Sequence, residues 1–358
     1  MASPELQPPS SLPEPAPAVS VGDVHVVPLD EWDDLVARLG GLDTYTRVAY
    51  HRASALLEVP GTEPVLLHFR HRTGEIALPL LLRSLPDGSG WDATSAYGYG
   101  GPAARTAGAR AAFGRALDAW ARANGVVSTF LRLHPLLDNH RLVPARAEII
   151  PVGSTVAWDV SPGRDLMATM HPHHRRAARR ADRADLEVSV VQRPDCLAGF
   201  RELYVTTMRR QEADPFFYFP TEYWESLLAD SETLHPVLVE GRLEGSLVAS
   251  LLCFAEGSRL HYHLGASHEA ARSIGASNRC FLAAAEWAQA REMTRFHLGG
   301  GVGGSAESSL YVFKQRFDPE SEPLPFHIAK IVHDRARYRE LAGTDGTAGF
   351  FPPWRRTP

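Results

Sequence analysis

The stretch Ala283-Ala-Ala-Glu-Trp287-Ala-Gln-Ala290 has a near copy earlier in the chain, Ala116-Leu-Asp-Ala-Trp120-Ala-Arg-Ala123. Both copies are rich in alanine, with a tryptophan at the same place, and each predicts a helix. Each is followed by a short apolar run typical of a strand, at 128–133 and 295–298. The two stretches indicate that the chain contains a duplicated unit.

Further matches extend outward from these helices in the same order. Apolar runs interrupted by a glycine turn predict β-hairpins at 64–82 and 236–253. A third strand-like run ends in glycine in each half, at 96–101 and 262–266. The order hairpin, strand, helix, strand therefore occurs twice. We predict an α/β (α+β) fold of two tandem domains, each a mixed, mostly antiparallel sheet flanked by helices.

A chain of 358 residues accommodates two such domains. The Pro- and Ser-rich segment 1–22 predicts a disordered leader. We expect the first domain at 23–160 and the second at 161–342, with the boundary near Ser161-Pro162-Gly163. The segment 343–358 is predicted to be a loose tail, although its aromatic residues could pack on the body.

The composition narrows the class of protein. A net charge of −5 gives no global attraction to DNA or a membrane surface. No apolar run is long enough for a transmembrane helix, and no secretory signal begins the chain. The three cysteines have no metal-ligand spacing, and His171, His173 and His174 have no companion ligands. We expect a cytoplasmic monomer without a metal.

Lysine is rare in this sequence. Of the 37 basic residues only Lys314 and Lys330 are lysines, and the rest are arginines. A compact ammonium and a guanidinium are not equivalent where the group must lose its water. We therefore interpret Lys314 as a functional residue and Lys330 as a chance retention.

A glycine-rich loop precedes Lys314. It contains Gly299, Gly300, Gly301, Gly303 and Gly304 directly after a predicted strand. Such a loop allows close backbone approach, so we predict a ligand-facing turn. Its GxGxxG spacing does not indicate a dinucleotide fold, because too little chain follows to build the parallel strands required.

The segment Phe313-Lys314-Gln315-Arg316-Phe317 follows the loop. Leu310, Phe313 and Phe317 recur at helical spacing, which predicts a packed helix with Lys314 beside its buried face. A cation there could stabilise an oxyanion. The alternative is a lysine that extends along the aromatic residues to solvent.

The Leu-Gly-Gly strand end, the Gly-rich loop and the Phe-Lys-x-x-Phe motif together resemble the C-terminal signature of the FemAB/FemX family. Members of that family consist of two GNAT domains and transfer an amino acid from aminoacyl-tRNA to a peptidoglycan precursor, or in related members to small natural products. The resemblance implies that Lys314 stabilises the transition state, with Phe313 beside it. Segments 166–190 and 200–228 are also similar to the family, and they imply that Arg209 lies near acceptor phosphates.

The chain departs from the family near its start. Segment 43–50 has no lysine where members hold an acceptor phosphate, so Arg47 is the available substitute. There is also no long helical arm of the kind that some members insert. These departures weaken the case for a UDP-linked acceptor.

Further candidate site residues carry charge or a titratable group. Arg175, Arg176, Arg179 and Arg180 share one helix stripe, which suits tRNA or nucleotide phosphates or is simply solvated. His261 and His263 alternate along a predicted strand and share one face. One of them, or Tyr262, could accept the amine proton, although core packing is the alternative.

The segment Arg272-Ser-Ile-Gly275-Ala-Ser277 approximates the Q/R-x-x-G-x-G/A loop that binds coenzyme A pyrophosphate in GNAT enzymes. We therefore expect no tightly bound cofactor and two possible donors, aminoacyl-tRNA or acetyl-CoA/acyl-CoA. The preferred function is FemX-like aminoacyl transfer to an amine of a peptidoglycan precursor, peptide or small molecule. The alternatives are an N-acetyltransferase and a non-catalytic double-GNAT binding protein.

Overall fold

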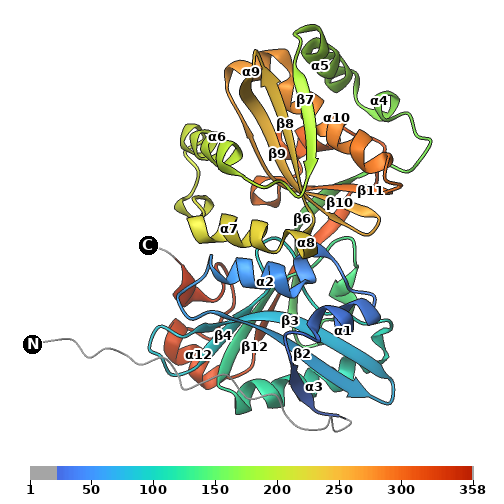
Figure 1. Cartoon of the computed structure of the whole chain (residues 1–358). Helices are drawn as coiled ribbons and strands as arrows, with labels where there is room; N and C mark the ends of the chain where they lie inside the picture. The colour runs from blue at the N-terminus through green and yellow to red at the C-terminus, as the bar shows by residue number, and fades with distance from the viewer. Residues whose placement is uncertain (1–21, 357–358) are drawn as a thin grey trace, which may run out of the picture. The chain divides into compact units, whose positions relative to one another are not determined.

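The computed structural model describes residues 22–356 and divides the chain into two compact units (Figure 1). Unit 1 comprises the described residues up to Pro151 together with those from Phe326 onward, and unit 2 comprises Val152–Pro325. The predicted disordered leader lies outside the described residues, apart from Gly22. None of the described helices is both long and apolar enough to cross a bilayer.

Unit 1 is built on a sheet with the order β1-β2-β3-β4-β5-β12. Among the described strands of this sheet, β4 and β5 are parallel neighbours, and the other neighbouring pairs are antiparallel. The strands are β1 (Val24–Val27), β2 (Glu63–His71), β3 (Gly74–Ser84), β4 (Trp91–Thr94), β5 (Val126–Arg132) and β12 (Leu324–Val332). The helices are α1 (Trp32–Arg38), α2 (Val48–Ala55), α3 (Arg110–Ala123) and α12 (Arg335–Ala342), with short 3-10 turns η1 (Thr44–Thr46), η2 (Ala107–Ala109), η3 (Asn139–Leu142) and η6 (Pro353–Arg355).

Unit 2 repeats this plan with the order β6-β11-β10-β9-β8-β7, in which only β10 and β11 are parallel. The strands are β6 (Glu148–Asp159), β7 (Glu187–Gln192), β8 (Pro236–Leu243), β9 (Ser246–Glu256), β10 (Arg259–Ser267) and β11 (Arg295–Gly300). The helices are α4 (Leu166–Thr169), α5 (Pro172–Arg183), α6 (Ala198–Arg210), α7 (Thr221–Ala229), α8 (Ser231–Leu234), α9 (Ala270–Ile274), α10 (Ala276–Gln289) and α11 (Ser309–Gln315), with 3-10 turns η4 (Pro215–Phe217) and η5 (Val302–Gly304).

The predicted duplication and fold class are confirmed. The hairpin β2–β3, strand β4, helix α3 and strand β5 of unit 1 correspond in order to β8–β9, β10, α10 and β11 of unit 2. One detail was wrong, because segment 96–101 is not a strand: β4 ends at Thr94, and only Gly100 makes an isolated bridge, to Leu133.

The last strand of each sheet comes from a different part of the chain than the sequence suggested. Strand β6 follows the first repeat but pairs with β11, and β12 follows the second repeat but pairs with β5. The unit borders therefore fall near 151 and 325, whereas the predicted borders were 160 and 342. Local sequence pattern identifies a strand, but it does not say which sheet the strand will join.

Alternation along the strands explains the layers. In unit 1, Leu67 packs with Phe113 of α3, whereas its neighbour Leu66 packs with Trp32 and Val36 of α1, because successive strand residues face opposite sides. In unit 2, α5 and α10 cover one side of the sheet and α6 lies on the other (Figure 1). Buried alanines on α10 let this helix approach the sheet closely.

The C-terminal segment of unit 1 is packed through Arg356, contrary to the loose tail that we predicted. Phe351 is 6% exposed and packs on Tyr338. The Trp354 indole donates to Asp92 at 2.7 Å, and Lys330 Nζ donates to the carbonyl oxygens of Thr347 and Gly349 at 2.6 and 3.1 Å. These polar bonds and the aromatic packing explain why a short, Gly-rich segment is held in place.

Candidate functional site

The parallel strands of unit 2 separate after three paired positions. Their register ends at His261 opposite His297, after which β10 continues along β9 as far as Ser267 and β11 continues along β6 as far as Gly300. This opening is the natural entry for a ligand, because the polar backbone edges of two strands face one space there. Residues from Tyr262 on β10 and from Leu298 on β11 flank it.

A β-bulge at Tyr262 decides which side chains of β10 face this opening. The register of β10 with β9 shifts between Tyr262 and Leu264. Tyr262 lines a pocket, whereas the Nε2 of His263 lies 2.8 Å from the hydroxyl of Tyr223. Burial lowers the pKa of His263 to about 3, so this imidazole is uncharged. Of the three predicted candidates, His261, Tyr262 and His263, only Tyr262 lines the pocket.

The pocket has a volume of about 350 Å³ and lies wholly within unit 2. Its lining contains three arginines and two histidines but no carboxylate. The lining residues are His173, His174, Thr207, Arg210, Gln211, Leu251, Tyr262, Gly265, Ala266, Ser267, Arg272, Gly275, Ser277, Asn278, Phe281, Leu310, Phe313 and Arg316. Such a charge balance favours an anionic ligand.

The predicted phosphate turn forms one wall of this pocket. Arg272, Gly275 and Ser277 all line it, at the junction between α9 and α10. Gly275 has φ +85°, and a Cβ there would lie 2.5 Å from the carbonyl oxygen of Ala177. The turn therefore requires glycine, and it aims the first N–H groups of a 14-residue helix at the pocket.

Asn278 adds a donor to this wall that the sequence did not reveal. Its side chain is 8% exposed, and its Nδ2 is buried without a hydrogen-bond partner. A buried amide left unpaired costs about 1–3 kcal/mol. An acceptor atom of a bound ligand would relieve this cost, so the orphaned amide supports a binding role for the wall.

Lys314 lies on α11, whose first turn is capped by Ser308. It is 5% exposed, its Nζ donates to the carbonyl oxygen of Gly300 at 2.7 Å, and it lies 5.1 Å from the ring centre of Tyr262. No carboxylate pairs with it among the described residues. Burial lowers the pKa of Lys314 to about 7. The lysine therefore contacts Tyr262, a residue of the pocket wall, at the end of the opening between the strands.

The glycine loop has mainly a packing role. Gly299 has φ +72°, and Gly300 presents its carbonyl to Lys314. A Cβ at Gly301 would lie 2.0 Å from the Ser308 hydroxyl, and one at Gly304 would meet the Val152 carbonyl. Gly303 has φ +64°. None of these five predicted residues lines the pocket, so the close backbone approach that the sequence indicated is to the chain itself.

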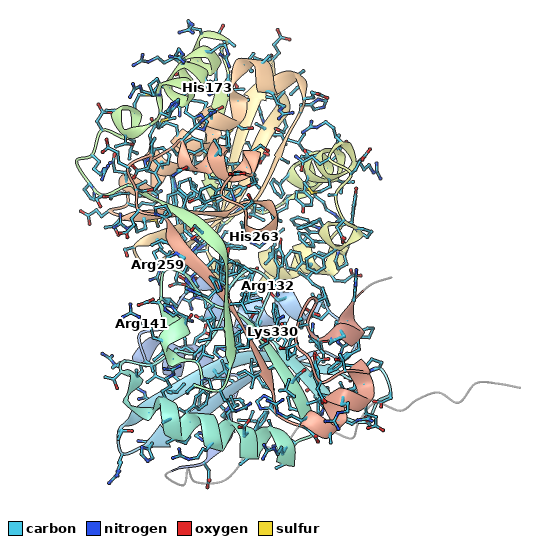
Figure 2. The ribbon with its side chains drawn as sticks, turned by 180° about the vertical axis from the view of Figure 1, so that it is seen from behind. Arg132, Arg141, His173, Arg259, His263 and Lys330 are labelled. Atoms are coloured by element: carbon cyan, nitrogen blue, oxygen red, sulfur yellow. The ribbon has the colours of Figure 1, made fainter. Side chains whose placement is uncertain are left out.

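Phe313 and His174 connect α11 to α5. Phe313 lines the pocket, and its carbonyl oxygen accepts a hydrogen bond from His174 Nε2 at 2.8 Å. His174 Nδ1 then lies 3.5 Å from Nδ1 of His173, which Figure 2 labels on α5, well away from His263. Burial is the largest cause that lowers the pKa of His174, to about 4. His171 is the N-cap of α5, and its side chain accepts a hydrogen bond from the backbone N–H of His173.

The predicted arginines are divided between structure and surface. Arg175 donates to the carbonyl oxygens of Ala168 and Met170, and Arg179 is exposed on α5. Arg209 is exposed and does not line the pocket, whereas its neighbour Arg210 does and donates to Ser267 O at 2.8 Å. The helical phase of α6 separates these two adjacent residues, and only knowledge of the buried face could have predicted it.

The two lysines prove to be alike in one respect. Lys330 is buried as well, and its ammonium bonds two backbone carbonyls. The scarcity of lysine therefore marks places where a compact ammonium is needed. It does not by itself identify a chemical role for Lys314.

Comparison with known families supports this interpretation of unit 2. Residues 170–308 match the family model described as Acetyltransferase (GNAT) domain. The matched segment contains α5, the α9–α10 turn and the opening between β10 and β11. The protein is therefore an acyltransferase that carries a GNAT domain in this segment.

Solved structures show the same fold over most of the chain. FemX is 13% identical with a TM-score of 0.66, over 89% of this chain and 99% of FemX. L-PGS from Bacillus licheniformis is 15% identical with a TM-score of 0.53, over 83% and 90%. A tandem GNAT protein from the clavulanic acid biosynthesis pathway is 15% identical with a TM-score of 0.50, over 87% and 99%. The chain thus shares the fold of these structures over most of its length. No curated protein sequence matches it.

Proposed function

We propose that this protein forms an amide bond by transferring an aminoacyl group from aminoacyl-tRNA to the amine of a peptidoglycan precursor, a peptide or a small natural product. The observation that carries the proposal is the buried Lys314 ammonium, which lies beside the pocket wall at the end of the opening between β10 and β11. In this proposal the opening admits the acyl ester, and the ammonium beside Tyr262 stabilises the oxygen that becomes negative.

The reaction requires positioning and electrostatics more than a covalent intermediate. The acceptor amine attacks the acyl carbonyl, the oxygen gains negative charge, and the ribose oxygen leaves. Lys314 stabilises the oxyanion in a site from which water is largely excluded, where one such donor contributes about 10²–10³ in kcat. Phe313 and Tyr262 keep the surroundings apolar.

The surface that adjoins the pocket favours an extended polyanion as the donor. His173 at the start of α5 lines the pocket, and exposed arginines continue along the helix at 176, 179, 180 and 183. Such a row suits several successive phosphates of an RNA backbone. A pocket ligand of nucleotide size would not reach along the 12 residues of α5.

The second candidate donor is acyl-CoA, and one observation favours it. Arg272, Gly275 and Ser277 all line the pocket at the N-terminus of α10, and such an arrangement suits a pyrophosphate. Both donors carry phosphate and an activated acyl group, so the same wall serves either. The experiment must therefore separate them directly.

The test uses the purified full chain with radiolabelled aminoacyl-tRNAs and, in parallel, labelled acetyl-CoA, each with a panel of amine acceptors. RNase treatment should abolish transfer if tRNA is the donor, and RNase-resistant transfer from acetyl-CoA would select the second candidate. Lys314→Met should reduce turnover about 10²–10³-fold. Arg272→Ala should weaken donor binding, whereas Arg291→Ala, at the far end of α10, should not.

Binding of a donor with no transfer to any acceptor would indicate a non-catalytic protein. Unchanged turnover in Lys314→Met would remove this residue from the reaction.

A further inference from the structure

The environment of Lys314 stabilises an uncharged amine. The side chain is 5% exposed, and among the described residues no carboxylate lies within ion-pair distance of its Nζ. An ammonium buried without an anion is unfavourable, and the usual response is loss of the proton. Burial alone accounts for the lowered pKa of about 7.

The one hydrogen bond of Lys314 is compatible with either protonation state. The carbonyl oxygen of Gly300 accepts one N–H at 2.7 Å, and a neutral amine still has a second N–H and a lone pair. Lys330 differs, because its nitrogen donates hydrogen bonds to two carbonyl oxygens. The geometry of Lys314 therefore leaves a lone pair for a third partner.

The other titratable groups near Lys314 are poorly suited to accept a proton. His174 of α5 commits Nε2 to the Phe313 carbonyl, and its pKa is about 4. His173, also on α5, has a lowered pKa, chiefly from burial and then from Arg316. On β11, His297 Nε2 lies 3.0 Å from the Thr155 hydroxyl.

Tyrosine and arginine side chains are the remaining titratable groups around Lys314. Tyr262 of β10 presents its ring to Lys314, and Tyr311 on α11 has a pKa raised by burial. Arg210, Arg272 and Arg316 line the pocket, and a guanidinium group donates hydrogen bonds but has no acceptor atom. Burial brings the pKa of Lys314 down to about 7, in the range where a general base is most effective.

We propose that Lys314 Nζ accepts the proton of the attacking amine and returns it to the leaving atom of the donor. This inference rests on the proposed function and goes beyond it, because electrostatic stabilisation alone would require only a permanent cation. The same nitrogen becomes that cation once it has taken the proton.

The step balances as follows. The uncharged acceptor amine forms the N–C bond while the carbonyl π pair moves onto oxygen. Lys314 takes one N–H proton and, as an ammonium, stabilises the oxyanion. The carbonyl then re-forms, the C–O bond of an aminoacyl ester or the C–S bond of a thioester breaks, and the leaving oxygen or sulfur takes the proton from Lys314. The lysine is restored to its uncharged form.

The chain offers a direct test that needs no substrate, since it contains only two lysines. The full protein is labelled with lysine carrying ¹³C at Cε, and the two signals are followed by NMR from pH 5.5 to 10. Lys330→Arg removes one signal and assigns the other. We expect the Lys314 signal to titrate with a midpoint within about one unit of 7. A signal that stays at the ammonium position up to pH 9.5 would overturn the proposal.

Kinetics separate this proposal from the function on which it rests. Lys314→Arg keeps a cation but cannot accept a proton, whereas Lys314→Met lacks both properties. We expect both variants to lose about 10²–10⁴ in kcat, the usual range for general acid–base catalysis. If Lys314→Arg keeps most of the activity that Lys314→Met loses, Lys314 acts only as a charge, and the proton-transfer role is wrong. If Lys314→Met is as active as the wild type, the proposed function itself fails at this residue.

Discussion

The phenol oxygen of Tyr262 lies over the backbone of Gly265, where a Cβ atom would be 2.5 Å away. The same ring has its centre 5.1 Å from Lys314 Nζ and 5.0 Å from the ring centre of Phe281. Gly265 therefore makes room for Tyr262 on one side while Lys314 and Phe281 contact it on the others. A glycine in the middle of a strand usually signals such a close approach.

Gly265→Ala should displace the Tyr262 ring and so disturb Lys314. We expect kcat to fall by about tenfold, which corresponds to an increase of about 1.4 kcal/mol in the activation free energy. The free energy of unfolding should change by less than this amount. Gly265→Ala combined with Tyr262→Phe should recover part of the loss, because the closest clash involves the hydroxyl oxygen. Steady-state kinetics of the two single variants and the double variant measure this coupling. Strictly additive effects would contradict the contact.

The stability of the protein should depend on pH through Lys314. Its pKa falls from 10.5 to about 7 on folding, so between these values the unfolded chain binds more protons than the folded chain. The free energy of unfolding contributed by this group therefore rises with pH from about 7 to 10.5, and below pH 7 the full cost of the buried ammonium remains.

Lys314→Met removes that titration. The variant should exceed the wild type in stability by a few kcal/mol at pH 6, at about 1.4 kcal/mol per pKa unit, and by much less at pH 9.5. Urea denaturation of both proteins at the two pH values gives the comparison. A difference that is the same at both pH values would show that Lys314 has an ordinary pKa.

Sequence patterns were sufficient to predict the repeated unit, because the local spacing of apolar residues determines where each helix and strand forms. The hairpins, α3 and α10 all fall where alternation and helical spacing placed them. The exchange of β6 and β12 could not be predicted in this way, since strand pairing is a long-range choice between two similar sheets.

The site was predictable to the extent that it follows chain motifs. Arg272, Gly275 and Ser277 line the pocket as their spacing suggested, and Phe313 joins them. Asn278 and His174 were not predicted as site residues, because an isolated amide or histidine has no sequence signature. Only burial makes either side chain unusual. The sequence analysis selected Arg209 instead of its neighbour Arg210. Adjacent residues on a helix point in directions about 100° apart, so only one of the two lines the pocket.

Asn278→Ala should leave the unliganded protein as stable as the wild type, or up to about 1 kcal/mol more stable, because an unpaired buried amide is removed. Donor binding should weaken about 5–10-fold, since one hydrogen bond contributes about 1 kcal/mol. Thermal denaturation with and without donor measures both effects.

Asn124→Ala provides the matched control at the end of α3. Its Nδ2 already donates to Trp120 O at 2.8 Å, so this change should reduce stability without affecting donor binding. If Asn278→Ala instead unfolds more easily and binds donor normally, its amide has a structural role.

The C-terminal segment should contribute measurably to the stability of unit 1. Asp92 is fully buried and accepts bonds from Arg83, Trp354 and Arg355. Trp354→Phe keeps an aromatic ring but removes one donor to this carboxylate, and we expect a loss of about 1–3 kcal/mol. Phe350→Ala, at a side chain that is 54% exposed, should change stability by less than about 0.5 kcal/mol. The comparison is made from the urea midpoints of the two variants. Equal midpoints would show that the bond from Trp354 to Asp92 does not stabilise unit 1.

The turn that precedes α10 has a counterpart in unit 1, where other residues fill the space beside it. Arg105 and Gly108 repeat Arg272 and Gly275, and each glycine lies 12 residues before its helix tryptophan (120 − 108 and 287 − 275). In unit 1 the hairpin turn packs on this place: a Cβ on Gly108 would lie 2.5 Å from the Thr73 carbonyl oxygen, and the Thr73 hydroxyl donates to Gly108 O. Arg105 Nε donates to Arg38 O at 2.6 Å.

We therefore expect one donor site per chain, in unit 2, despite two copies of the turn. In unit 2, Gly275, Ser277 and Asn278 line the pocket, so the start of α10 is accessible to a ligand. Titration calorimetry with coenzyme A and with a 3′-aminoacylamide RNA minihelix should give a stoichiometry near one for whichever ligand binds. Arg272→Ala should weaken that binding about tenfold, the effect expected when a charged hydrogen bond of 1.5 kcal/mol or more is lost. Arg105→Ala should leave it unchanged, since its guanidinium is engaged with the Arg38 carbonyl. A stoichiometry of two, or equal losses in the two variants, would mean that the turn of unit 1 can open to bind a ligand as well.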